Sequence, residues 1–203
     1  MRYSGERKAQ SRERILRSAV KLFSHQGYEK TSIDEVMADA ELTRGAFYAH
    51  FESKQQLYAE AITESKTFSV FTRPKPAEIS DQDWVEQLIS LYLNRRHITE
   101  VDLPCPLAFL ATDVAVREPE IRRAYTDVYA GMNKRMHAYV SRYADCDEET
   151  VPAITAMMIG GVAVARALDN GVQRNRLLKS VRQTVSAMLQ AKKKGSAEPL
   201  SEA

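Results

Sequence analysis

The stretch Thr43–Lys54 reads TRGAFYAHFESK, and it is unusual for a helix in a globular protein. Phe47 and Phe51 are four residues apart, which places them on one face of a helix. Gly45 falls in the first turn, although glycine inside a helix costs up to about 1 kcal/mol relative to alanine. The stretch also has few of the long side chains that stabilise helices. We therefore expect that another molecule needs the bare backbone at Gly45 for close contact.

Helical periodicity continues on both sides of this stretch. The first helix is expected to end at Gly27, a natural carboxy-terminal cap. Thr31 or Ser32 caps a short second helix, and Glu35 is spaced to form a capping box with Ser32. Residues 40–42 then make a tight link into the quoted stretch. Two short helices joined in this way predict a helix-turn-helix, whose second helix lies in the major groove of DNA.

The predicted helix-turn-helix assigns a role to each outward-facing position. Phe47 and Phe51 pack inward, and the amino end of the helix meets base edges. Arg44 is the natural candidate for a bidentate contact to guanine. Side chains farther along can donate to phosphates, which fix register without reading sequence. The predicted base-edge positions are Thr43, Arg44, Gly45 and Ala46, and the predicted phosphate contacts are Tyr48, His50 and Lys54.

The composition requires any DNA-binding surface to be local. The chain has 203 residues, of which 28% are charged and 44% hydrophobic, with a net charge of +2. This is an ordinary globular balance and not that of a generally basic protein. A positive arm flanks the first helix and is expected to lie over the DNA backbone. Its members are Arg2, Arg7, Lys8, Arg12 and Arg14, set against Glu6 and Glu13.

The remaining sequence predicts an all-α, intracellular protein. No segment shows the sustained alternation of a half-buried strand. The opening MRYSGERKAQSRER is charged and has no apolar segment, so we expect no secretory signal. The apolar run Val151–Ala165 is expected to be too short to span a bilayer. Two cysteines in such a chain suggest reduced thiols in the cytoplasm.

The span from about Ile15 to Ile62 closely resembles the DNA-binding domain of the tetracycline-repressor (TetR) family. Residues 27–58, GYEKTSIDEVMADAELTRGAFYAHFESKQQLY, carry its motifs. These are a Gly-aromatic end to the first helix, Thr opening the second, T-R-G-x-F-Y-x-H-F in the third and S-K opening the fourth. The resemblance implies a dimer whose amino-terminal domain binds a palindromic operator and whose larger carboxy-terminal domain binds a small molecule. It also adds Thr31 to the DNA contacts. We expect the DNA-binding domain at 1–52, the ligand-binding and dimerisation domain at 53–191, and a disordered tail at 192–203.

Aromatic and methionine side chains in the second part of the chain have two interpretations. A stripe at helical spacing runs from Ile121 to Tyr143, and such a stripe is either plain core or the lining of a ligand pocket. Cys105, before Pro106 at a helix start, is either a small buried residue or a sensor of oxidants or electrophiles. Cys146 stands among acidic residues and is expected to be inert. The predicted pocket residues are Phe68, Trp84, Tyr92, Cys105, Phe109, Tyr125, Tyr129 and Met132.

Two helices near the carboxy terminus predict the dimer contact. The segment Val151–Leu168 is apolar nearly all round and carries the small pair Gly160 and Gly161. A helix that is apolar on every side has to be buried on every side, either as the central helix of a monomer or in a dimer. Paired with the next helix, it would form a four-helix bundle across a two-fold axis. The predicted interface residues are Met157, Gly160, Gly161, Val164, Leu178, Val181, Val185 and Met188.

The sequence shows none of the patterns that an enzyme of a common class would need. We find no nucleophile with a base, no phosphate loop and no His/Cys/Asp set at metal-ligand spacing, so no cofactor or metal is predicted. Two alternatives remain: a helical carrier or enzyme with an inactive helix-turn-helix, and an architectural DNA binder without a ligand. We expect a ligand-responsive transcriptional regulator, a repressor, that acts as a cytoplasmic homodimer on double-stranded operator DNA, with a small-molecule effector and no membrane partner.

Overall fold

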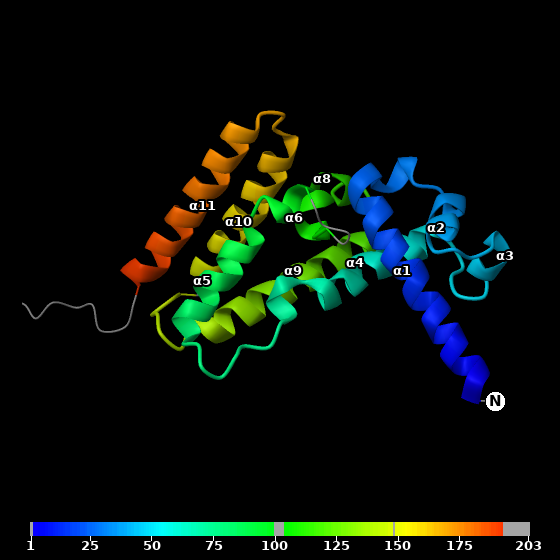
Figure 1. Cartoon of the computed structure of the whole chain (residues 1–203), viewed down its shortest axis with the longest axis horizontal. Coiled ribbons are helices and arrows are strands. Elements are labelled where there is room, and N and C mark those ends of the chain that lie inside the picture. Colours follow the sequence, from blue (N-terminus) through cyan, green and yellow to red (C-terminus); the bar gives the residue numbers. More distant parts are fainter. Residues whose placement is uncertain (1, 100–103, 148, 193–203) are drawn as a thin grey trace, which may run out of the picture. The chain divides into compact units, whose positions relative to one another are not determined.

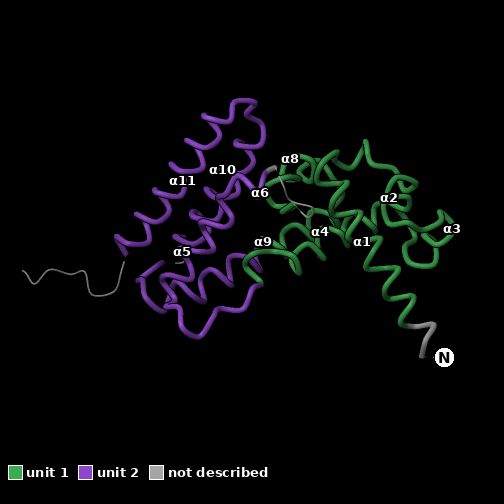
Figure 2. Tube along the Cα trace, viewed as in Figure 1, with its two compact units in different colours: residues 1–72, 101–129 green, residues 73–100, 130–203 purple. Residues whose placement is uncertain are grey.

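A computed structural model describes residues 2–99, 104–147 and 149–192, and the regular elements in these ranges are all helices (Figure 1). The predicted all-α fold class is confirmed. The chain divides into two compact units, Met1–Thr72 with Val101–Tyr129, and Arg73–Glu100 with Ala130–Ala203 (Figure 2). Unit 1 extends beyond residue 52, and the predicted boundary between DNA-binding and ligand-binding functions stays a prediction. The predicted tail lies, from residue 193 on, outside the described residues.

Helix α1 (Arg2–Lys30) contains both the predicted positive arm and the helix that was expected to end at Gly27. Its buried side chains, from Ile15 to Phe23, pack mainly on α4 (Lys54–Glu64) and α2 (Ile33–Asp39). The helical conformation of α1 is interrupted at Gly27, the predicted cap, because this residue has φ 82° and ψ 174°. Glycine adopts this left-handed conformation without the steric cost of a side chain.

Capping bonds fix the starts of the two helices that flank the quoted stretch. At α2, the Glu35 N–H donates to Ser32 Oγ at 3.1 Å, and the Ser32 N–H donates to Glu35 Oε2 at 2.7 Å. The predicted capping box is therefore confirmed. At α4, Ser53 Oγ accepts from the Gln56 N–H at 3.0 Å, but the Gln56 side chain accepts from Glu52 instead of Ser53. Only half of a capping box therefore forms at Ser53, and its one bond still fixes the first turn of α4.

The rest of unit 1 consists of short pieces. Two 3-10 turns, η1 (Ser65–Phe68) and η2 (Val70–Thr72), follow α4. After the gap come α7 (Pro106–Phe109), α8 (Ala111–Val114) and the first part of α9 (Pro119–Val140). Proline opens α7 and α9, as expected for a residue that has no N–H to leave unpaired. Helix α9 is continuous through the boundary between the two units at residues 129 and 130.

Unit 2 is held together by the packing of its two carboxy-terminal helices, α10 (Thr150–Ala167) and α11 (Gly171–Ala191). Gly161 permits their close approach, because a Cβ built on it would lie 3.1 Å from Cγ2 of Val181. Helices α5 (Asp81–Tyr92) and α6 (Arg96–Thr99) also contact α10. The interface between α10 and α11 therefore forms within one chain.

The apolar helix α10 has 18 residues and is long and apolar enough to cross a membrane by length and composition. The expectation that this run is too short was therefore wrong by the bounds of the helix. Half of the window is buried inside the structure, as in the core helix of a soluble protein, which passes the same test. The composition of α10 is thus weak evidence for a membrane span, and its packing on α11 accounts for its apolar residues.

Candidate nucleic-acid interface

A tight turn joins α2 to α3 (Arg44–Phe47). Glu41 has φ 54°, a left-handed conformation that reverses the chain, and the Leu42 N–H donates to the Met37 carbonyl at 2.9 Å. Helix α3 contacts α2 and lies at the rim of unit 1, beyond α2 (Figure 1). These two helices and their short link form the predicted helix-turn-helix.

The second helix of this pair is a single turn. Helix α3 spans Arg44–Phe47, and the N–H groups of His50 and Phe51 then donate to the Phe47 carbonyl at 2.9 and 3.0 Å. The longer helix expected over the quoted stretch does not form, because Gly45 and the lack of long side chains give it little intrinsic stability. Phe47 and Phe51 are buried, with 0% and 1% of their surface exposed, as predicted. They anchor the turn in the core and leave its other residues outside.

Gly45 lies on the exposed side of α3, and nothing stands within 4 Å of a Cβ built on it. The packing of the chain itself therefore does not require glycine at this position. Thr43 and Arg44 are exposed and Ala46 is half-buried. A smooth, small surface at the amino end of α3 is what a close approach to a duplex needs.

Arg44 is paired with an acidic residue on α2. Its Nη1 donates to Asp34 Oδ2 at 2.6 Å, although the two side chains are 63% and 57% exposed. The bond to Asp34 therefore restricts the orientation of the guanidinium of the predicted base-reading residue.

Tyr48 and His50 follow α3 and differ in their exposure. Tyr48 is 63% exposed, with its ring edge-on to Phe47 at a centroid distance of 5.2 Å. His50 is half-buried, and its Nδ1 has no hydrogen-bond partner among the described residues. Burial, followed by the positive charges of Lys8 and Arg12, lowers the pKa of His50 below its ordinary value. A neutral imidazole can donate one hydrogen bond to a phosphate without adding charge.

Lys54 opens α4 and is held over an aromatic ring. Its Nζ lies 4.2 Å from the ring centroid of Tyr28, which is within the range of a cation–π contact. Burial lowers the pKa of Lys54, and Glu29 opposes that effect. The ring of Tyr28 thus restricts where the ammonium group of the predicted phosphate contact can lie.

Thr31 differs from the other predicted contacts because its side chain is fully buried. Its Oγ1 donates to the carbonyl of Gly27 at 2.9 Å, across the break in α1. In this structure the hydroxyl stabilises the link between α1 and α2 and does not face the outer surface.

Sequence reasoning missed a charged cluster that links α1 and α4 to α8. The Tyr58 hydroxyl donates to Asp113 Oδ2 at 2.5 Å, and Arg117 pairs with Asp113 at 2.8 Å and with Glu29 at 2.5 Å. The Arg117 guanidinium also lies 4.6 Å from the ring centroid of Tyr28. The spacing of Asp113 and Arg117, four residues apart, is visible in the sequence, but the contacts with α1 and α4 have no local signal.

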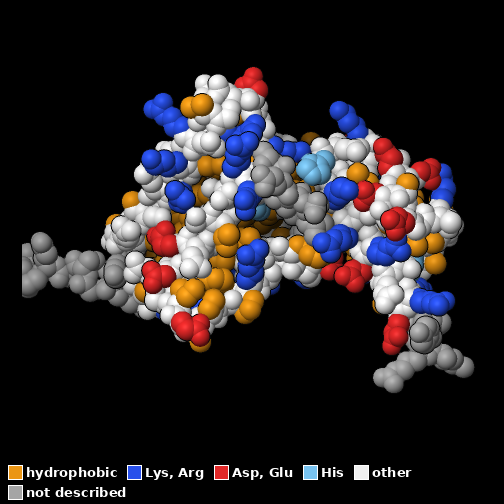
Figure 3. Space-filling view, viewed as in Figure 1, with side chains coloured by type: hydrophobic (Ala, Val, Ile, Leu, Met, Phe, Trp, Pro, Cys, Tyr) orange, Lys and Arg blue, Asp and Glu red, His pale blue; other side chains and the backbone are white. Residues whose placement is uncertain are grey.

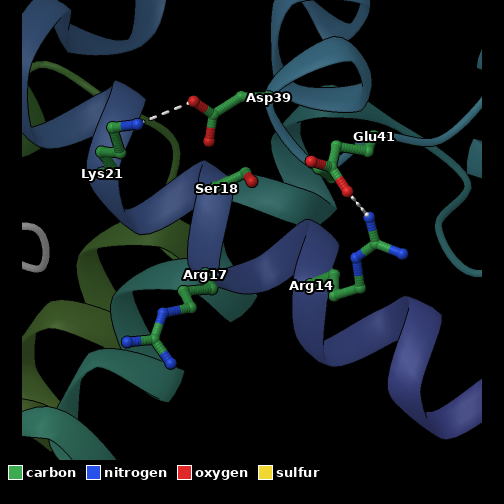
Figure 4. A pocket seen from close by; sticks show the side chains of 7 residues that line it. Arg14, Arg17, Ser18, Lys21, Asp39 and Glu41 are labelled. Carbon is green, nitrogen blue, oxygen red and sulfur yellow. Dashed lines mark hydrogen bonds and ion pairs between the residues drawn. The ribbon is translucent and has the colours of Figure 1, made fainter.

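The predicted basic arm belongs to α1, and ion pairs neutralise part of it. Arg14 pairs with Glu41 at 2.8 Å, and Arg12 pairs with Glu60. A groove of about 300 Å³ lies between α1 and the turn after α2 (Figure 4). The ion pairs Arg14–Glu41 and Lys21–Asp39 bridge it. Basic and acidic side chains are mixed over this part of the face seen in Figure 3. Any attraction for DNA therefore comes from particular side chains and not from a uniformly positive face.

The predicted ligand-pocket residues are divided between the units. Unit 1 contains Phe68, Cys105, Phe109, Tyr125 and Tyr129, and unit 2 contains Trp84, Tyr92 and Met132. Trp84, Tyr92, Phe109 and Met132 are buried, whereas Phe68, Cys105, Tyr125 and Tyr129 are half-buried. A second groove, along α5 in unit 2, is lined by other residues, among them Glu78, Asp83 and Glu86. The ligand pocket stays a prediction.

Both cysteines are half-buried, and neither forms a disulfide bond. Cys105 is the N-cap residue of α7. Burial, more than the neighbouring Asp145 and Asp147, raises the pKa of Cys146, which agrees in direction with its predicted inertness. The sensor role of Cys105 stays a prediction.

The predicted dimer residues fall into two groups. Gly161, Leu178 and Val185 are buried inside unit 2. Met157, Gly160, Val181 and Met188 are half-buried, and Val164 is 53% exposed. Only this second group offers surface for a partner, and the dimer itself stays a prediction.

Within the described residues, no group of three or more His, Cys, Asp or Glu side chains could hold a metal ion.

Comparison with known proteins identifies the family. The sequence model of the bacterial regulatory proteins of the tetR family matches residues 15–61, the segment that contains α2, α3 and most of α4. The HTH-type transcriptional regulator LmrA of Bacillus subtilis (strain 168) is 25% identical over 170 residues, 79% of this chain and 88% of that protein. Residues 15–61 are a DNA-binding domain of the TetR family. The HTH-type transcriptional repressor BepR of Brucella suis biovar 1 (strain 1330) is 26% identical over 172 residues, 79% of this chain and 82% of that protein.

Solved TetR-family structures share the fold over most of the chain. A putative regulator of the TetR/AcrR family has a TM-score of 0.72 at 17% identity and covers 88% of this chain and 98% of its own. The reduced form of NemR from E. coli has a TM-score of 0.71 at 15% identity, over 86% and 94% of the two chains. LmrA and BepR are named as transcriptional regulators, a class of proteins that are generally not enzymes.

Proposed function

We propose that this TetR-family protein is a ligand-responsive transcriptional repressor that binds a palindromic operator as a cytoplasmic homodimer and is released by a small molecule. The observation that carries the proposal is the exposed surface of α3 and the residue after it. Phe47 is buried and anchors this turn in the core, whereas Arg44, Gly45 and Tyr48 are exposed. Gly45 has room for a side chain and lacks one, and the neighbouring residues are donors suited to bases and phosphates.

Release by a ligand follows from the geometry that a dimer needs. Two recognition helices can occupy successive major grooves only if they lie about 34 Å apart, or a multiple of this. A ligand that prefers another spacing weakens operator binding by its differential affinity, typically about 1–3 kcal/mol. Helix α4 is suited to transmit a change in the spacing of the recognition helices. It begins at Lys54, a predicted phosphate contact, and its Tyr58 hydroxyl is hydrogen-bonded to Asp113, which precedes α9.

The proposal is tested by enrichment of duplex oligonucleotides of random sequence on the full-length protein. We expect an inverted repeat to emerge, with half-sites one or more helical turns apart. Recovery of unselected sequences only would count against a sequence-specific regulator. An enriched site whose binding responds to no compound in a broad small-molecule collection would favour the architectural alternative.

A further inference from the structure

The ion pair between Arg44 and Asp34 joins the two helices of the helix-turn-helix. Asp34 lies in the first turn of α2, and Arg44 is the first residue of α3. The Nη1–Oδ2 distance is 2.6 Å. The capping bonds at the start of α2 are made by Ser32 and Glu35, so the carboxylate of Asp34 is not needed for the cap.

The geometry leaves Arg44 able to contact a base while it stays bound to Asp34. A guanidinium has five N–H donors in one plane, and a bidentate contact to guanine uses two of them. The bond to Asp34 involves Nη1, which leaves the edge formed by Nε and Nη2 for the base. Both side chains are more than half exposed, so a base edge can reach this pair.

The charge of Asp34 has a second consequence at a DNA surface. A carboxylate close to a duplex is repelled by phosphates, and this repulsion acts on every sequence alike. An arginine that is fixed in one orientation loses less side-chain freedom when it binds the matching base. One side chain can therefore weaken binding to unrelated DNA and favour one base over the others.

We propose that Asp34 is a positioning residue that sets the base preference of Arg44. The proposal rests on the proposed function, since it requires that α3 reads DNA. Asp34 does not contact a base itself: it sets the base preference only through the guanidinium, whereas its charge lowers the affinity for all sequences alike. Its removal should flatten the preference at the base pair that Arg44 reads and strengthen binding to unrelated DNA.

The test is the same enrichment from random duplex DNA, made in parallel with wild type, Asp34→Asn, Arg44→Ala and the double variant. Asp39→Asn is the matched control, because it removes the same charge from the other end of α2, where Asp39 pairs with Lys21 at 2.7 Å. An exposed ion pair is worth little for folding, so Asp34→Asn should unfold at the wild-type temperature, which thermal unfolding checks.

We expect Asp34→Asn to reduce the preference at one base pair per half-site by about two- to fivefold, the range that an exposed ion pair supports. The affected base pair should be the one whose preference Arg44→Ala changes. At that base pair, the double variant should show the same preference as Arg44→Ala alone. The control should leave that preference unchanged.

The proposal is overturned if Asp34→Asn keeps the wild-type preference at the position that Arg44→Ala alters, in which case the proposed function stands. It is also overturned if Asp34→Asn changes a different base pair, since Asp34 would then contact DNA itself. If wild type enriches no sequence, the proposed function fails, and the role of Asp34 fails with it.

Discussion

At the scale of single residues, Arg44 and Lys54 have different predicted roles in DNA binding. Arg44→Ala should cost about 1–3 kcal/mol and relax the preference at one base pair per half-site, because a bidentate base contact is lost. Lys54→Ala should weaken binding to all sequences alike and reduce the dependence of affinity on salt, because a phosphate contact is lost. Titrations of both variants against single-base site variants at several salt concentrations measure these effects. Wild-type binding by both variants would show that α3 and the start of α4 do not face DNA.

Gly45 gives a prediction in which stability and binding change in opposite directions. Gly45→Ala should stabilise the folded protein by up to about 1 kcal/mol, because alanine favours the helix and its Cβ meets nothing within 4 Å. The same methyl group should lower the affinity for the operator, because it stands where the duplex approaches. Chemical denaturation and DNA titration of one protein preparation provide both numbers. Unchanged affinity would mean that the bare backbone at Gly45 is not part of the contact.

At the scale of elements, local signals predicted the helix starts well. The capping box of Ser32 and Glu35 and the helix that begins at Pro106 depend on residues a few positions apart, so the sequence shows them directly. The length of α3 was harder to predict, because the sequence shows that Gly45 weakens the helix but does not show at which residue the helix ends. The cluster around Asp113 could not be predicted, because Tyr58 and Asp113 are far apart in the sequence and only the fold brings them together.

The bond between Tyr58 and Asp113 should stabilise unit 1 strongly. A hydrogen bond to a charged group contributes about 1.5–3 kcal/mol, and a bond to a neutral carbonyl contributes about half of that. Tyr58→Phe should therefore lower the free energy of unfolding more than Tyr125→Phe, whose hydroxyl donates to the Leu107 carbonyl at 2.7 Å. Urea unfolding of the two variants makes the comparison. Equal losses would mean that the charge of Asp113 adds nothing to its bond with Tyr58.

At the scale of the whole molecule, the dimer depends on the outward side of α10. Val164 is 53% exposed, so Val164→Glu should leave the fold intact and give a monomer with reduced operator affinity. Gly161→Glu is not an equivalent test, because its side chain would collide with Val181 inside the chain. Val116→Glu, at a residue 78% exposed in unit 1, is the matched control and should stay dimeric. Analytical ultracentrifugation with circular dichroism distinguishes loss of the dimer from loss of the fold, and a wild-type monomer at micromolar concentration would contradict the dimer.

The central claim is that α3 reads the sequence of duplex DNA, and one titration tests it most directly. Wild-type protein is titrated into a fluorescent duplex that carries the enriched site and into a scrambled duplex of equal length and composition, at physiological salt. A sequence reader should bind the site at least about 10³-fold more tightly than the scrambled duplex. Equal affinity for the two duplexes would contradict the claim.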